Sequence, residues 1–71
     1  MQLQPLNRPK RIVIYASDIE KITGLSMRSV YRLMHDIRVA FGKDSRAFIT
    51  IQEFCYYTCI AEELVRTFID S

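Results

Sequence analysis

Residues 24–33 have the sequence Gly24-Leu25-Ser26-Met27-Arg28-Ser29-Val30-Tyr31-Arg32-Leu33, and they decide the fold of this 71-residue chain. Glycine commonly ends a helix because it adopts the left-handed backbone conformation without a Cβ penalty. Serine is a favoured N-cap, since its side-chain oxygen accepts a hydrogen bond from a free backbone N–H of the helix that follows. Gly24 and Ser26 therefore predict a short turn between two helices, the arrangement of a helix-turn-helix.

The second of these helices is expected to start after Ser26 and to run to about Phe41, where Gly42 ends it. At about 100° per residue its apolar side chains gather on one face, which consists of Val30, Leu33, Met34, Ile37 and Phe41. The opposite face is centred on Arg28, Arg32, His35 and Val39. The helix is thus predicted to pack through the first face and to present the second to solvent or a partner.

Two segments carry the Ser/Thr-x-x-Glu pattern of a capping box, in which each side chain satisfies a free backbone N–H at a helix start. They are Ser17 to Glu20 and Thr50 to Glu53. The further helices predicted from these caps and from apolar spacing cover residues 18–23, 52–58 and 61–69. The chain is therefore expected to contain about four helices.

Residues 12–15 and 47–51 are rich in β-branched side chains and are predicted strands. The two halves of the chain also match at an offset of 35 residues, through pairs that include Ile14 with Ile49, Asp18 with Glu53, Thr23 with Thr58 and Val30 with Val65. This similarity predicts two helical hairpins that share one core, with the strands paired as a ribbon between them. The second hairpin has Cys59 where Gly24 would align and lacks a basic outer face, so it is predicted to be scaffold.

The length and composition of the chain favour one small globular domain. Hydrophobic residues make up 49% of the sequence, and no apolar run approaches the roughly 18 residues of a membrane span. We therefore expect a cytoplasmic protein without a membrane segment, with its domain over residues 12–71. Residues 1–11, which contain Arg8, Lys10 and Arg11, are expected to form a flexible basic arm.

Positive charge is concentrated in the first part of the chain, with a formal charge of +5 over residues 1–46 and −3 over residues 47–71. Such a division suits a protein that presents one face to a polyanion. Cys55 and Cys59 are four residues apart in a segment of helical character, a poor geometry for a disulfide, and are predicted to be small buried hydrophobes. Because the single histidine, His35, lies in another helix, no metal site or other cofactor is predicted.

Residues 24–32 resemble the G-[LV]-S-x-R-[ST]-V-Y-R run of small excisionase and AlpA-type DNA-binding proteins, and are also similar to resolvase-type helix-turn-helix segments. The resemblance implies a mainly α, winged-helix or excisionase-like fold with a short two-stranded β-ribbon. It places the second helix in the major groove of DNA, with its N-terminal residues nearest the bases. Ile19, Leu25, Val30 and Leu33 then take inward positions, whereas Glu20 departs from the small residue usual at its position.

The residues predicted to contact DNA are Ser26, Arg28, Ser29, Tyr31, Arg32, His35, Lys43 and Arg46. The arginines of the second helix suit guanine edges or phosphate, and its hydroxyl groups suit phosphate. His35 is either a backbone contact or a solvated histidine. Lys43 and Arg46 would reach the flanking backbone as a small wing, and the basic arm either enters the minor groove or only aids solubility. Val39 is either a partner contact or part of the helix that clears the DNA.

The function predicted from the sequence is specific binding of double-stranded DNA, by a transcriptional regulator or by a recombination or excision accessory factor. A homodimer or a cooperative array on repeated sites is expected, because one short helix-turn-helix seldom buries enough surface for tight specific binding. The alternative is a protein adaptor that binds an acidic partner through the same basic face. No catalytic residues are predicted, since the sequence has no paired-carboxylate cleft, activated nucleophile or phosphate-binding glycine loop.

Overall fold

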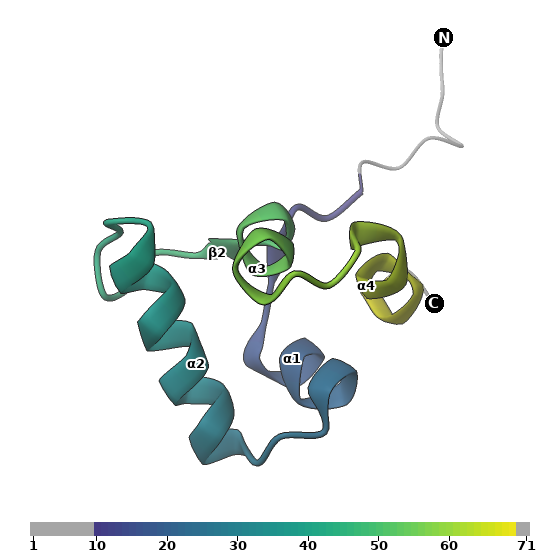
Figure 1. Ribbon diagram of the computed structural model, residues 1–71, viewed down its shortest axis with the longest axis horizontal. Coiled ribbons are helices and arrows are strands. Elements are labelled where there is room, and N and C mark those ends of the chain that lie inside the picture. The colour runs from purple at the N-terminus through teal and green to yellow at the C-terminus, as the bar shows by residue number, and fades with distance from the viewer. Residues whose placement is uncertain (1–9, 70–71) are drawn as a thin grey trace, which may run out of the picture.

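The chain folds into two helical hairpins joined by a small antiparallel sheet, and a computed structural model describes its residues 10–69 (Figure 1). In chain order the elements are β1 (Val13–Ile14), α1 (Ala16–Thr23), α2 (Met27–Ala40), β2 (Ile49–Thr50), α3 (Ile51–Thr58) and α4 (Glu62–Ile69). The prediction of a mainly α fold with four helices and a short two-stranded ribbon is confirmed for this part of the chain.

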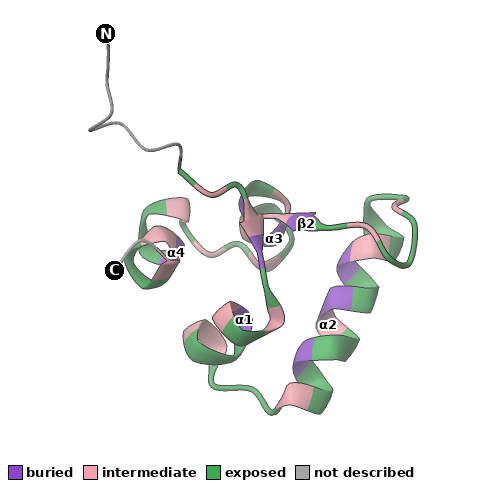
Figure 2. Ribbon diagram, turned by 180° about the vertical axis from the view of Figure 1, so that it is seen from behind, coloured by how far each residue is buried: buried purple, intermediate pink, exposed green. Residues whose placement is uncertain are grey.

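The hydrophobic core lies between the two hairpins and receives buried side chains from every helix and from both strands (Figure 2). These buried residues are Ile14, Ile19, Val30, Met34, Ile37, Ile49, Ile51, Phe54 and Val65. Helix α1 packs against α2 and α4, and α3 packs against the same two helices. The two hairpins therefore share one core, as the similarity between the halves of the sequence predicted.

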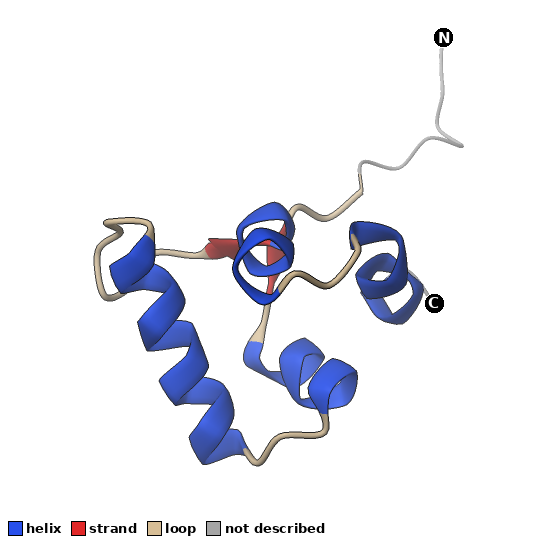
Figure 3. Cartoon of the chain, in the orientation of Figure 1, coloured by secondary structure: helices blue, strands red, loops and turns tan. Residues whose placement is uncertain are grey.

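The sheet pairs the two predicted strand segments in antiparallel register, with Val13 opposite Thr50 and Ile14 opposite Ile49 (Figure 3). Side chains alternate between the faces of a strand, so Ile14 and Ile49 both enter the core while their neighbours lie nearer the surface. The ladder continues one step further, because the N–H of Ile51 donates to the carbonyl of Ile12 at 2.8 Å.

Helix α2 begins and ends close to its predicted limits. The Ser26 hydroxyl oxygen accepts a hydrogen bond from the N–H of Ser29 at 3.3 Å, which confirms the predicted N-cap. Two predicted inward positions are wrong: Leu25 is 40% exposed, and Phe41 is 36% exposed. Phe41 instead packs edge-to-face on the exposed Tyr56, with the ring centroids 5.9 Å apart.

Helix α1 begins two residues earlier than predicted, at Ala16, and the predicted capping box of Ser17 and Glu20 is wrong. The Asp18 carboxylate accepts the N–H of Tyr15 at 2.8 Å and so takes the capping role. Asp18 is held in place by an ion pair with Arg11 at 2.6 Å, a contact that Glu20 does not make. Glu20 is exposed, so its carboxylate does not disturb the packing of α1 on α2.

Helix α3 starts with the capping box predicted from the sequence. The N–H of Glu53 donates to the Thr50 hydroxyl at 3.0 Å, and the N–H of Thr50 donates to the Glu53 carboxylate at 2.9 Å. Glu53 thus holds the same place in the second hairpin that Asp18 holds in the first. Each carboxylate is also ion-paired, Asp18 with Arg11 and Glu53 with Lys43 at 2.7 Å.

The ends of α1 and α3 also match. Gly24 has φ of 74° and donates its N–H to the Glu20 carbonyl at 2.8 Å, while Cys59 has φ of 63° and donates to the Cys55 carbonyl at 2.8 Å. One residue earlier, a threonine hydroxyl donates to the carbonyl four residues back at 2.7 Å in both hairpins. The 35-residue similarity is therefore a repeat of local structure, with Cys59 in the position of the turn glycine.

The turn position explains why the predicted environment of Cys59 is wrong. Cys59 is exposed at the end of α3 rather than buried inside a helix, while Cys55 is half-buried and both thiols are free. Burial raises the pKa of the Cys55 thiol, and the nearby Glu62 carboxylate raises it further. Cys55 is accordingly a weak nucleophile, as expected for a packing residue.

Substitutions at the two turn positions are expected to change stability in opposite directions. A left-handed backbone costs a residue with a Cβ about 1–2 kcal/mol, partly offset by the lower entropy of its unfolded chain. Gly24→Ala, where the added Cβ meets no atom within 4 Å, should therefore lower the free energy of unfolding by about 1 kcal/mol. Cys59→Gly should raise it by roughly 0.5–1 kcal/mol. Urea unfolding under reducing conditions measures both, and effects of the same sign would contradict the explanation.

Candidate nucleic-acid interface

The outward face of α2 carries the residues that the sequence placed there. Arg28, Arg32, His35 and Val39 are all exposed, whereas Val30, Met34 and Ile37 on the opposite side are buried. Figure 2 shows this division along the helix, with the buried positions facing the core and exposed ones facing solvent. We call Arg28, Arg32, His35 and Val39 the outer stripe of α2. Because its other side is buried, the helix presents this stripe on a fixed support.

The start of α2 adds hydroxyl groups next to the outer stripe. The Ser26 hydroxyl donates to the Ser29 hydroxyl at 3.3 Å, and both serines are exposed. Tyr31, which is 60% exposed, lies at the edge of the stripe. The N–H groups of a first helical turn have no partners within the helix, so a helix start attracts anions. The structure thus brings six of the eight predicted contact residues together on α2 and its cap.

The basic residues of the described chain fall into two groups. Those with partners inside the fold are Arg11 with Asp18, Lys43 with Glu53, Arg66 with Glu62, and Arg38, whose Nε donates to the Ala47 carbonyl at 2.8 Å. Over residues 10–69, the second group forms neither an ion pair nor a hydrogen bond through its charged side chains, and consists of Lys10, Lys21, Arg28, Arg32 and Arg46. Their charge is therefore accessible to an external anion.

Two side-chain contacts hold the loop after α2, residues 41–48, in place. Arg38 holds it from α2, and Lys43 holds it from the side of α3 through Glu53. Burial raises the pKa of Glu53, but hydrogen bonds from Lys43 and the Thr50 N–H outweigh it and keep that pKa below its usual value. Lys43, predicted to contact the DNA backbone, is thus half-buried in an internal ion pair, and Arg46 is the predicted wing residue that remains exposed.

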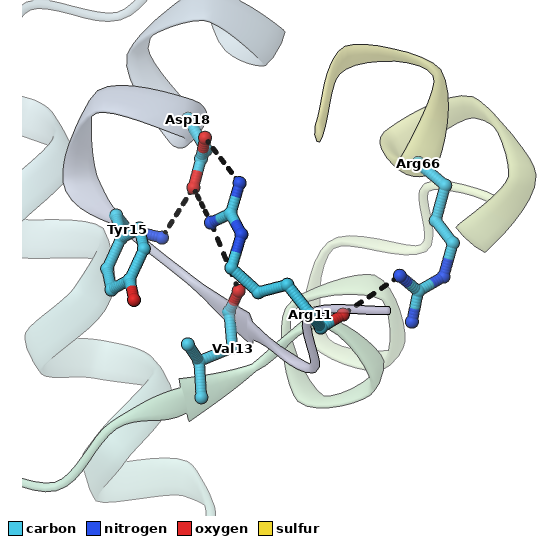
Figure 4. A network of polar contacts seen from close by, with 5 residues as sticks. All are labelled: Arg11, Val13, Tyr15, Asp18 and Arg66. Atoms are coloured by element: carbon cyan, nitrogen blue, oxygen red, sulfur yellow. Dashed lines mark hydrogen bonds and ion pairs between the residues drawn. The ribbon is translucent and has the colours of Figure 1, made fainter. Parts of the chain in front are cut away.

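Arg11, which the sequence assigned to the predicted basic arm, makes several contacts with the folded domain. Its guanidinium donates to Asp18 at 2.6 Å and lies 4.8 Å from the centre of the Tyr15 ring, while Arg66 donates to its carbonyl at 3.0 Å (Figure 4). Burial raises the pKa of Asp18, but the hydrogen bonds from Arg11 and Tyr15 lower it by more, so the net shift is downward. Arg8 lies outside the described residues, and Lys10 is exposed.

Arg38 is the residue whose role the sequence did not predict. It sits at the edge of the outer stripe, where spacing alone cannot separate it from the exposed arginines. Unlike the exposed arginines, Arg38 donates a hydrogen bond to the Ala47 carbonyl, nine residues away, and this contact fixes the last turn of α2. Position on a helix face is therefore insufficient to identify an available cation.

The described residues offer no group of three or more potential metal ligands among their His, Cys, Asp and Glu side chains. No helix within residues 10–69 is both long enough and apolar enough to cross a membrane. No protein-family model, curated protein or solved structure matches this chain. The chemistry of the α2 surface is therefore the basis for assigning a function.

Proposed function

We propose that the protein binds double-stranded DNA in a sequence-specific manner through α2, as a transcriptional regulator or as a recombination or excision accessory factor. The observation that carries this proposal is the outer stripe, in which Arg28 and Arg32 are exposed and have no ion-pair partner among residues 10–69, on a helix anchored by its buried side. Elsewhere in the described chain, most arginines are engaged by acidic groups or carbonyls of the fold.

The dimensions of the helix fit this role. The major groove is about 12 Å wide and admits one α-helix with its side chains. Arg28 and Arg32 are four residues apart, which corresponds to about 6 Å along the helix axis, or about two base-pair steps. Each guanidinium can donate two hydrogen bonds to the O6 and N7 acceptors of a guanine, while Ser26, Ser29 and the first-turn N–H groups meet a phosphate.

In this proposal, residues outside α2 add positive charge that contacts phosphate, and a second copy of the chain increases the surface buried on DNA. Arg46, which is exposed in the loop after α2, would contact a flanking phosphate in this proposal. A single small module buries little surface on DNA, so the proposal includes a homodimer or a cooperative array on repeated sites.

Fluorescence polarisation with a labelled random-sequence duplex tests the proposal. If two to four phosphates are contacted, affinity should fall roughly 10- to 150-fold between about 50 and about 200 mM salt. Selection of bound sequences from a random duplex pool should then yield a defined site. Poly-glutamate is a control polyanion and should compete poorly with the selected duplex.

Absence of duplex binding at micromolar protein and low salt would reject DNA as the ligand. That result favours the adaptor function, in which the outer stripe binds an acidic protein partner. Equal competition by poly-glutamate and by the selected duplex would likewise argue against specific recognition of DNA.

A further inference from the structure

Val39 is the residue of the outer stripe that charge does not explain. Its side chain is 66% exposed, although valine is apolar and is a weaker helix former than alanine. Val39 is nine residues after the fully buried Val30, or about two and a half helical turns, so it lies on the opposite side of α2 from the core. It follows Arg32 by seven residues and His35 by four, which places it in line with both.

The last turn of α2 is held firmly, and Val39 with it. The neighbouring Arg38 donates to the Ala47 carbonyl at 2.8 Å, and the N–H of Lys43 donates to the Arg38 carbonyl at 2.8 Å. Phe41 packs edge-to-face on Tyr56 of α3. A β-branched side chain also has few χ1 rotamers in a helix. Val39 is therefore a small, rigid apolar group at a fixed place on the surface that carries the unpaired arginines.

We propose that Val39 contacts the C5 methyl group of a thymine in the major groove and makes the protein selective for a 5-methylpyrimidine at that position. This inference rests on the proposed DNA-binding function. The thymine methyl is the apolar feature that a major groove presents, and aliphatic side chains are suited to read it. The seven residues from Arg32 to Val39 span about 10.5 Å, or about three base-pair steps. The expected site thus has a thymine about three base pairs from the guanine read by Arg32.

Replacing thymines with uracil, one at a time, in the selected duplex tests this assignment, because uracil lacks only the methyl group. The wild-type protein should lose about fourfold in affinity at one thymine, as expected when one methyl-sized apolar contact is removed. Val39→Ala should bind the thymine and uracil duplexes equally well. Since the Val39 side chain is mostly exposed, this variant should keep its fold, which circular dichroism verifies.

Leu64→Ala provides a matched control. Leu64 is a similarly exposed aliphatic residue, 62% accessible, but it lies on α4 away from the outer stripe. This variant should retain the wild-type preference for thymine over uracil. The control separates a specific contact from a general effect of removing surface apolar area.

Three outcomes overturn the inference. If the wild-type protein binds equally well when uracil replaces each thymine in turn, there is no methyl contact. If the Val39→Ala protein still prefers thymine, another residue makes that contact. Loss of self-association in Val39→Ala, measured by sedimentation and without a change in thymine preference, assigns Val39 to a protein interface. In these cases duplex binding remains, whereas failure to bind any duplex rejects the proposed function itself.

Discussion

Replacement of both Arg28 and Arg32 by alanine is expected to weaken binding to the selected duplex at least thirtyfold. Each guanidinium that donates two hydrogen bonds to a base contributes about 1–3 kcal/mol of discrimination, so the two losses together correspond to about 2–6 kcal/mol. Both side chains are exposed and form no ion pair over residues 10–69. The free energy of unfolding should therefore change by less than about 0.5 kcal/mol. Polarisation titrations and urea unfolding measure the two quantities on the same samples.

A control with the same change in net charge separates base recognition from general attraction to DNA. Lys10 and Lys21 are exposed basic residues outside α2, and Lys10→Ala/Lys21→Ala also removes two positive charges. The lysine variant should lose affinity for selected and random duplexes by similar factors. The arginine variant should instead lose most of its preference for the selected duplex. Retention of that preference by Arg28→Ala/Arg32→Ala would show that α2 does not read the bases through these residues.

Phe54→Ala is expected to destabilise the fold by about 3–5 kcal/mol. Phe54 is the largest of the fully buried side chains, and it lies on α3, which packs against α2, α4 and both strands. A domain of this size has about 4–11 kcal/mol of total stability, so the variant should be largely unfolded at 37 °C or close to it. Thermal and urea unfolding followed by circular dichroism measure the change.

Tyr56→Ala is the matched control on the same helix. Tyr56 is 80% exposed and makes an edge-to-face contact with Phe41, so its removal should cost only about 0.5–1.5 kcal/mol. A Phe54→Ala protein as stable as the Tyr56 variant would mean that the two hairpins do not depend on one shared core.

The sequence was most informative where neighbouring residues decide the structure. Ser26 and Gly42 bracket α2, and its apolar spacing correctly identified Val30, Met34 and Ile37 as buried. Local hydrogen bonds also made the capping box at the start of α3 predictable. In each of these cases the partners lie within one or two helical turns of one another.

Predictions failed where a contact from outside the local segment decides the outcome. At the start of α1, the Asp18 carboxylate caps the helix in place of the predicted Ser17 and Glu20 box, and its ion pair comes from Arg11, seven residues earlier. Lys43 is similarly engaged by Glu53, which is ten residues away and on another element. Position 59 carries cysteine and not glycine, so its residue type did not predict the left-handed backbone that ends α3 there. Tertiary pairing therefore decided which basic residues remained available to a ligand.

Basic residues that are paired inside the fold and basic residues that are not differ in how freely they can be substituted during evolution. Over residues 10–69, the side chains at positions 28, 32 and 39 are exposed and form no ion pair or side-chain hydrogen bond, so we expect them to be exchangeable without a compensating change elsewhere. Arg11, Lys43 and Arg66 have no such freedom, because each ties two segments of the chain together. Under the proposed DNA-binding function, this separation would permit rapid divergence of the recognised site on an unchanged scaffold.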